Sequence, residues 1–403
     1  MKKILLLSFL SVLLYACGEK NQATETKKNF DFPKGETIAE GVDKVADVVI
    51  YDDTMFFSAF PSLVKLDNGD LLCSFRRAPN RVPFGADRNY HVDPNSYLVS
   101  VKSTDGGMTW TKEPQLMFAH PFGGSQDPCL LKLANGDILC TSYYWIQIGK
   151  NFLEEYKDRF YIDNWAYAGG FLIRSNDGGA TWQGPLDPGS PLPTETRSTM
   201  LGKFQLYNRG ALCQSPDGTI SWAVACENGR EGGSSVYLVQ SHDNGVTWEY
   251  RSPIIDDDSL NFNETSIYET PNGDLVAFIR SLDWPSDEGY ISRSTDGGVS
   301  FKSEGMGFQG HPFHALRLPD NRVLLTYGYR HEPYGIKAKI LNPECTDFRE
   351  APEIIIREDA GGTDIGYTWS EMIDDTHVLV SYYYNFEQQQ GVRKILGTIL
   401  EIK

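Results

Sequence analysis

One hairpin pattern recurs six times along the chain, and this repetition constrains the fold more than any other feature. Each copy is an apolar strand, a tight turn of the Asn-Gly or Asp-Gly type, and a second apolar strand. Successive turns lie roughly 48 to 82 residues apart, the spacing expected of blades with four strands each. The sequence therefore predicts an all-β protein, a six-bladed β-propeller. The copies occupy residues 60–77, 127–144, 209–226, 264–281, 312–329 and 367–384.

A second motif, Ser-x-Asp-x-Gly-x-[Thr/Ser]-[Trp/Phe], recurs between the hairpins. In each copy the Asp can bond the backbone of its own turn, and the Gly can supply a positive φ. Repeat architectures repeat their structural contacts and not their chemistry, so we interpret these motifs as structural turns that need no calcium. The full copies occupy residues 103–110, 175–182, 241–248 and 294–301, with a degraded copy at 341–348.

The first 17 residues place two lysines before an apolar run that is too short to span a bilayer and ends at Cys17. The ending Leu-Tyr-Ala-Cys is similar to a bacterial lipobox, and an ordinary cleaved signal is the alternative. A lipobox implies lipidation of Cys17, a location in the bacterial cell envelope, on the outer membrane or the periplasmic face, and membrane contact through the lipid anchor only. Residues 18–41 are polar, so we expect a flexible tether before a propeller domain at 42–403.

Charge and cysteine content narrow the possible partners. The net charge of −17 argues against a nucleic-acid partner, which requires clustered Lys and Arg. The six cysteines after Cys17 lack the spacing of metal ligands, and the expected state is a small buried thiol, with one or two disulfides left open. We expect no metal, no cofactor and a monomer.

Strand order within a blade predicts which face of the propeller carries function. Because the strands are antiparallel, both turn types fall on one face, and the starts of first strands and ends of second strands fall on the other. Ionisable groups gathered there are costly unless they bind something. Counting back from each hairpin turn gives a ring of Phe60, Asp127, Arg209, Glu264, Pro312 and Tyr367. The second-strand ends add Arg76, Arg77, Arg280, Arg330 and several tyrosines.

The repeated turns resemble the Asp-boxes, or BNR repeats, of the sialidase superfamily over essentially the whole mature chain. The stretch from Glu264 to Arg280 is similar to the family segment that supplies a catalytic Glu and a substrate-binding Arg. The stretch around Tyr367 is similar to the family segment that contains the nucleophilic Tyr. A neutral phenol activated by a carboxylate suits a substrate whose own carboxylate would repel an anionic nucleophile. The resemblance implies that Tyr367 and Glu264 form this pair.

The same resemblance implies a general acid on the loop before the first Asp-box. It maps this role to Asp93, and Asp87 on the same loop is the competitor. Sialidases hold the substrate carboxylate with three arginines, whose guanidinium groups match it bidentately. Arg280 and Arg330 match two of them. Ala59 stands where the first is expected, and Arg76 or Arg77 is the candidate replacement.

Three further residues complete the predicted substrate-binding set. Asp127 could orient an arginine or take part in catalysis, and Arg209 belongs to the same ring. His311, with His314 nearby, could assist proton transfer or bond sugar hydroxyls. The long aromatic insertion at 145–165 is either a wall that stacks on sugar rings or a self-packed loop.

Together these features predict a sialidase-like exo-glycoside hydrolase that releases a terminal acidic sugar, sialic-acid-like or uronic, from glycans by a retaining Tyr/Glu mechanism. Two alternatives remain open, and the absence of an arginine at Ala59 supports the first of them. One is a glycan-binding propeller without catalysis. The other is a propeller polysaccharide lyase that uses His and Tyr chemistry on uronic acids.

Overall fold

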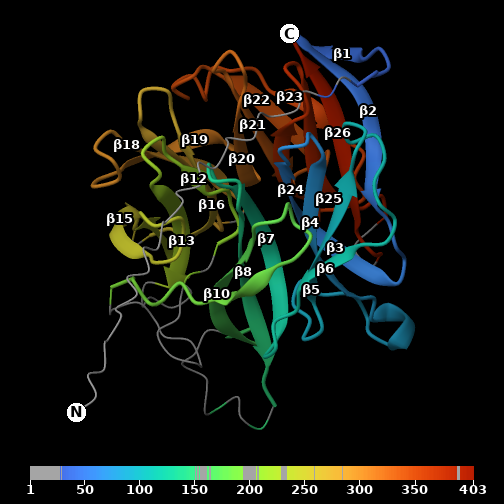
Figure 1. Cartoon of the computed structure of the whole chain (residues 1–403), viewed down its shortest axis with the longest axis vertical. Helices are drawn as coiled ribbons and strands as arrows, with labels where there is room; N and C mark the ends of the chain where they lie inside the picture. The colour runs from blue at the N-terminus through green and yellow to red at the C-terminus, as the bar shows by residue number, and fades with distance from the viewer. Residues whose placement is uncertain are drawn as a thin grey trace, which may run out of the picture.

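The chain folds into six antiparallel sheets arranged around a common centre, the predicted six-bladed β-propeller (Figure 1). Each sheet is one blade. The first strand of each repeated hairpin is the innermost, as the repeat pattern predicts, and in blade 6 this strand is β24. The computed structural model describes residues 28, 30–149, 151, 154, 161–162, 165–193, 206, 208–227, 234–257, 259–283, 285–387 and 391–403.

The first three blades follow one another along the chain. Blade 1 contains β3 (Phe56–Lys65), β4 (Leu71–Pro79), β5 (Tyr97–Ser103) and β6 (Gln115–Phe118), with the short 3-10 helix η1 (Val82–Phe84) between β4 and β5. Blade 2 contains β7 (Gly124–Lys132), β8 (Ile138–Gln147), β9 (Tyr161–Ile162), β10 (Trp165–Ser175) and β11 (Gln183–Leu186). Blade 3 contains β12 (Cys213–Gln214), β13 (Ile220–Glu227), β14 (Ser234–Ser241) and β15 (Glu249–Ile255).

The remaining blades lead back to the N-terminal strands. Blade 4 contains β16 (Phe262–Glu269), β17 (Leu275–Ser281), β18 (Glu288–Ser294) and β19 (Lys302–Gln309). Blade 5 contains β20 (His311–Arg317), β21 (Val323–Tyr329), β22 (Gly335–Leu341) and β23 (Ile354–Arg357). Blade 6 contains β24 (Gly366–Met372), β25 (His377–Tyr384) and β26 (Lys394–Ile402), followed by β2 (Val42–Tyr51) and β1 (Glu36–Ala39).

The two ends of the propeller chain meet in blade 6, which closes the ring. Strand β2 pairs with β26 along most of its length, from Val42 opposite Ile402 to Tyr51 opposite Ile395. Strand β1 then pairs with β2 at the outer edge. The propeller therefore begins before residue 42, and the predicted tether extends too far toward the C-terminus. The reason is that β1, whose polar composition predicts an unstructured segment, is ordered by backbone pairing with β2.

The stretch that precedes β1 also contacts the propeller. Lys28 pairs with Asp70 in the β3–β4 turn, at 2.5 Å. The Phe32 ring packs on His377 in blade 6, with ring centroids 4.3 Å apart. These contacts lie on the face that carries the hairpin turns. The predicted signal, with Cys17, and residues 18–27 and 29 of the predicted tether lie outside the described residues.

The Asp-boxes have the structural role that the sequence predicts. In blade 1, Asp105 Oδ1 accepts a bond from the backbone N–H of Thr109 at 2.9 Å and another from the Ser103 hydroxyl at 2.8 Å. Gly106 and Gly107 adopt φ of 73° and 89°, a region that disfavours larger residues. The Trp110 indole donates to the Gly107 carbonyl at 2.9 Å. Asp177, Asp243 and Asp296 repeat the Asp pattern.

The structure shows whether the described cysteines form disulfides, which composition left open. All six are free thiols, and five of them are buried in the blades. They therefore act as small apolar residues of the core. Over the described part of the chain, no helix has the length and hydrophobicity that crossing a bilayer requires.

Candidate active site

A backbone irregularity marks the start of the inner strand in five of the six blades. The pairing of each inner strand with its neighbour shifts register at Ala59/Ser62, Gln126/Cys129, Phe262/Thr265, His311/Phe313 and Gly366/Trp369. Each shift brackets a residue of the predicted ring. Phe60, Asp127 and Tyr367 have positive φ of 62°, 26° and 55°. Bulges and strained backbone of this kind re-aim side chains at functional sites, so the ring that the sequence predicts is a structural unit.

Tyr367 and Glu264 meet at the centre of this ring. The Tyr367 hydroxyl donates a short hydrogen bond to Glu264 Oε1, and Arg280 Nη1 binds Glu264 Oε2 while lying 3.2 Å from the Tyr367 hydroxyl. Tyr367 and Glu264 are 4% and 3% exposed. Burial and the charge of Glu264 raise the pKa of Tyr367 above its usual value, with Arg280 and Arg330 opposing them. The phenol therefore stays protonated at neutral pH, with Glu264 placed to remove its proton.

Arg280 is held in place by a chain of buried side chains. Its Nε donates to His311 Nδ1 at 3.1 Å, and His311 Nε2 bonds Asp287. His331 Nε2 lies 2.9 Å from the other oxygen of Asp287. Burial and the charges of Arg280 and Arg330 lower the pKa of His311, so its ring is neutral. His311 thus orients Arg280, a role that differs from the direct substrate contact predicted for it.

The same His and Asp residues are close enough to share a metal ion, because their ligand atoms lie within 4.8 Å of one another. The hydrogen-bond pattern argues against this use. His311 accepts the Arg280 bond at Nδ1, so its ring proton is on Nε2, which faces Asp287. A protonated nitrogen has no lone pair for a metal. The group fits a support for Arg280 better than a metal centre.

Arg330 also lies close to Tyr367. Its guanidinium carbon lies 5.4 Å from the centre of the Tyr367 ring, and its nitrogens donate to the Ile365 carbonyl and, at 2.9 Å, to the Tyr383 hydroxyl. Tyr383 in turn donates to Asp364 Oδ1 at 2.7 Å. The structure therefore brings both Arg280 and Arg330 close to Tyr367.

The structure distinguishes between the two candidate replacements for the missing arginine. Arg76 pairs directly with Ala59 across the β3–β4 ladder and is fully buried. Its Nε and Nη1 have no hydrogen-bond partner within the described ranges. Arg77 points the opposite way, since neighbouring residues in a strand face opposite sides, and it binds Asp53 at 3.1 Å and stacks on the Phe56 ring. The predicted site contribution of Arg77 is therefore wrong, and Arg76 is the residue on the ring side.

Asp127 is a buried acid with one unused oxygen. Its Oδ2 accepts a hydrogen bond from the Tyr143 hydroxyl at 2.7 Å, and its Oδ1 is buried without a hydrogen-bond partner among the residues that the structure places. Burial, reinforced by the charge of Glu264, raises the pKa of Asp127 to about 6. A carboxyl group with these properties can hold and deliver a proton near neutral pH.

Asp93 has a different environment from the one expected of a proton donor. Arg81 holds it in a bidentate pair, with Nε to Oδ2 at 2.8 Å and Nη2 to Oδ1 at 2.9 Å. The backbone N–H of Asn95 also donates to Oδ1. These contacts hold the Asp93 carboxyl group in one orientation. Asp87 is exposed, and its Oδ1 is bonded within its own loop, by the backbone N–H of Arg88 and the Tyr90 hydroxyl.

Arg209 lies beneath the ring on the propeller axis. Its Nη2 donates to the backbone carbonyls of Pro61 and Tyr367, the latter at 3.2 Å, and its guanidinium stacks over Trp369 at 4.9 Å. Its charged group therefore supports the backbone of blades 1 and 6. This position accounts for the burial of Arg209 without any contact to substrate. Substrate contact was the role predicted for this residue.

The sequence prediction missed three acid or base residues around Tyr367. His91 lies 2.8 Å from Asp364 and packs edge-on against Phe60, which itself contacts Tyr367 at 4.7 Å between ring centroids. His91, Arg393 and Arg330 hold the pKa of Asp364 well below its usual range, although burial opposes them. Asp287, described above, comes from the β17–β18 loop. All of these lie outside the repeated hairpin positions, so the repeat register could not find them. Most of the aromatic insertion in blade 2 lies outside the described residues.

Comparison with known proteins identifies relatives of this fold. The family model described as BNR repeat-like domain matches residues 156–372. A crystal structure of a protein of unknown function from Dyadobacter fermentans is 52% identical, with a TM-score of 0.87, and the match covers 91% of this chain and 100% of that one. No curated protein matches the chain.

Two enzymes share the architecture at low identity. The intramolecular trans-sialidase of Ruminococcus gnavus is 14% identical with a TM-score of 0.60, covering 86% of this chain and 96% of that one. The GH93 α-L-arabinofuranosidase of Fusarium graminearum is also 14% identical with a TM-score of 0.60, covering 89% and 98%. Identity this low establishes a sialidase-like fold and nothing finer.

Proposed function

The chain belongs to the BNR repeat-like domain family, and on this basis we propose that it is an exo-acting, retaining glycoside hydrolase that removes a terminal acidic sugar from glycans. The hydrogen bond between the Tyr367 hydroxyl and Glu264 at the centre of the ring carries this proposal. A buried phenol bonded to a carboxylate is what nucleophilic catalysis requires, because the carboxylate removes the proton as the oxygen attacks.

The reaction would proceed in two displacements. Tyr367 Oη attacks the anomeric carbon while its proton passes to Glu264, and the bond to the leaving oxygen breaks as an acid protonates that oxygen. Water then attacks the same carbon and gives a proton to the conjugate base of that acid. The bond to Tyr367 Oη breaks, the sugar is released, and Tyr367 Oη takes its proton back from Glu264. Two displacements give net retention of configuration.

Three arginines support the choice of an acidic sugar. Arg280 and Arg330 both lie close to Tyr367, and Arg76 lies across the ladder from Ala59 with two buried nitrogens that have no partner among the described residues. A buried guanidinium with unused donors is stabilised by an anionic ligand, and a carboxylate matches its geometry. The trans-sialidase of R. gnavus was crystallised with oseltamivir carboxylate, a ligand of this class.

Asp127 is the residue that we propose as the proton donor. It has a raised pKa, a free oxygen and a position on the ring shared with Glu264 and Tyr367. Asp93, which the family resemblance favours, is committed to Arg81 and would have to leave this pair before it could donate a proton. Both assignments can be separated by experiment, as described in the Discussion.

The decisive experiment is a screen of purified protein against glycans with terminal sialic or uronic acids, with identification of the released sugar. The proposal expects release of an acidic monosaccharide with retained anomeric configuration, and loss of release in Glu264→Gln. A product that is unsaturated and absorbs in the ultraviolet would instead identify a lyase.

A glycan-binding propeller is the second candidate, and Ala59 favours it because the first carboxylate-binding arginine of sialidases is absent there. This function predicts saturable binding of acidic glycans, unchanged in Glu264→Gln, and no released sugar from any substrate in the screen.

We further propose that lipidation of Cys17 anchors the protein in the bacterial cell envelope. The lipobox-like ending of the apolar N-terminal run supports this. Metabolic labelling with a lipid precursor should mark the wild-type chain and not Cys17→Ser.

A further inference from the structure

A cavity lies on the propeller axis, on the hairpin-turn side of Tyr367. Its volume is about 660 Å³, and all six inner strands contribute to its wall. It reaches the hairpin-turn face, since Pro216 and Gly273 from two of those turns line it. Tyr367 and Glu371 lie on the same strand, β24, and four residues of extended strand span roughly 13 Å. The cavity is therefore separate from the candidate active site.

Two ring nitrogens in this cavity are hydrogen-bond donors without acceptors. His314 Nδ1 accepts a bond from the backbone N–H of Ser370 at 3.2 Å. Burial and the charge of Arg209 lower the pKa of His314 to about 3, so the ring is neutral and carries its proton on Nε2. Neither this N–H nor the indole N–H of Trp369 has a partner among the described residues. His314 and Trp369 are only 5% and 4% exposed.

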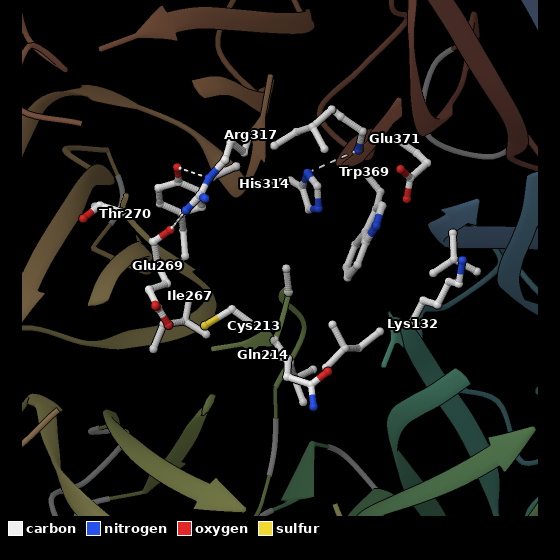
Figure 2. Close-up of a pocket in the computed structure, with 18 of the residues that line it drawn as sticks. Lys132, Cys213, Gln214, Ile267, Glu269, Thr270, His314, Arg317, Trp369 and Glu371 are labelled. Carbon is white, nitrogen blue, oxygen red and sulfur yellow. Dashed lines mark hydrogen bonds between the residues drawn. The ribbon is translucent and has the colours of Figure 1, made fainter. Parts of the chain in front are cut away.

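The two rings form one side of the cavity. They pack against each other with centroids 4.6 Å apart. Figure 2 shows both reaching toward the middle of the cavity, with Cys213 and Gln214 on the opposite wall. The guanidinium carbon of Arg209 lies 4.9 Å from the centre of the Trp369 ring. Both rings are thus packed against neighbouring side chains.

The other polar groups on the cavity wall include one carboxyl group that can exchange a proton and cations that are already paired. Burial raises the pKa of Glu371 to about 7, so this carboxyl can donate or accept near neutral pH. The cations at the rim are already engaged, Lys132 by Asp67 and Arg317 by the Tyr268 hydroxyl and a backbone carbonyl. The rest of the lining is largely apolar, with Leu63, Leu130 and Leu212 among its members.

We propose that the axial cavity is a second binding site, for one or two neutral sugar units. Sugar hydroxyls both accept and donate, which suits the two unpaired N–H groups and the carboxyl of Glu371, and sugar C–H faces suit the apolar wall. The volume lies within the range of pockets that bind small ligands, roughly 300 to 1,000 Å³. An anionic sugar is disfavoured, because no unengaged cation lines the described wall.

The test is isothermal titration calorimetry of the full chain with galactose, glucose and lactose up to tens of millimolar. We expect saturable binding of at least one of these probes. Trp369→Phe, which keeps a ring and removes the N–H, should weaken it at least fivefold, and Ala211→Leu, which adds three carbons at the wall, should abolish it. Glu264→Gln serves as the matched control on the opposite face and should leave binding unchanged.

Two results would overturn the proposal. One is no binding of any probe by the wild-type protein. The other is binding that survives both Trp369→Phe and Ala211→Leu, above all if Glu264→Gln removes it, since the sugar would then occupy the catalytic face. Circular dichroism of each variant shows that it is folded. Because this assay needs no turnover, its outcome is independent of the proposed hydrolase activity.

Discussion

Replacing Asp127 by Asn should stabilise the protein, and only above acidic pH. The pKa of Asp127 rises from 3.8 to about 6 in the folded protein, mainly because the group is buried. A higher pKa in the folded state means that the folded protein binds the proton more tightly than the unfolded chain. The cost of the group to folding therefore builds up as pH rises from the unfolded to the folded pKa, by about 1.36 kcal/mol for each pH unit between the two values, and reaches about 3 kcal/mol above the folded pKa.

The pH window follows from the same two values. Below about pH 3 both states are protonated and Asp127 costs nothing, and above about pH 7 the full cost of about 3 kcal/mol applies. Asn keeps an oxygen for the Tyr143 hydroxyl and carries no charge. With an unfolding entropy of about 2.1 cal/mol/K per residue over roughly 360 residues, this gain raises Tm by about 4 °C.

Thermal unfolding at pH 4 and pH 8 measures this directly. Asp127→Asn should melt about 4 °C above wild type at pH 8 and within about 1 °C of it at pH 4. Asp93→Asn is the matched control, because it removes the same charge from a bidentate pair with Arg81 and should not stabilise. A variant of Asp127 that is less stable than wild type at pH 8 would refute the reasoning, since the ionised carboxylate would then be favourably paired.

Other predictions test the site and the fold. If Asp127 is the proton donor, Asp127→Asn should reduce the turnover of glycans by a factor of about 10² to 10⁴. Turnover of substrates with dinitrophenyl leaving groups should fall little, because these leaving groups need no protonation. Asp93→Asn should show no such difference between the two kinds of substrate, and the reverse pattern would favour Asp93. Asp105→Ala, which removes three hydrogen bonds of an Asp-box, should cost roughly 1 to 2 kcal/mol in chemical unfolding and leave kcat unchanged, and reduced kcat at full stability would contradict its structural role. Because the ring proton of His311 is on Nε2 and faces Asp287, this group should bind no metal, and dialysis against a chelator should not change activity. Elemental analysis that finds one bound metal per chain would show that the hydrogen-bond assignment is wrong.

The repeat made much of this structure predictable. Six copies of one hairpin fix the blade number and the register, and the register places Glu264 and Tyr367 on one ring without any knowledge of their contacts. In five blades the bulge occurs at the same ring position. Counting residues back from the hairpin turn therefore reaches the equivalent position in each of these blades. Where the chain repeats, the position of a residue in one blade predicts its position in another.

The failures occur where the chain does not repeat. Arg81 and Asp93 lie in one irregular loop, and their pairing depends on its conformation. Arg77 was misplaced because two adjacent arginines at a strand end satisfy the same count although only one faces the ring. The N-terminal strands were missed as part of blade 6, since β1 is a polar edge strand ordered by β2 and not by its own composition.

The central claim is that Tyr367 attacks the sugar with the help of Glu264. The most direct test is turnover by Tyr367→Phe, which removes one oxygen atom and keeps the ring packed against Phe60. On the acidic glycan identified by the screen, kcat should fall by at least about 10³, with substrate binding retained, because the arginines remain in place. A Tyr367→Phe enzyme that keeps kcat within about tenfold of wild type would contradict the account.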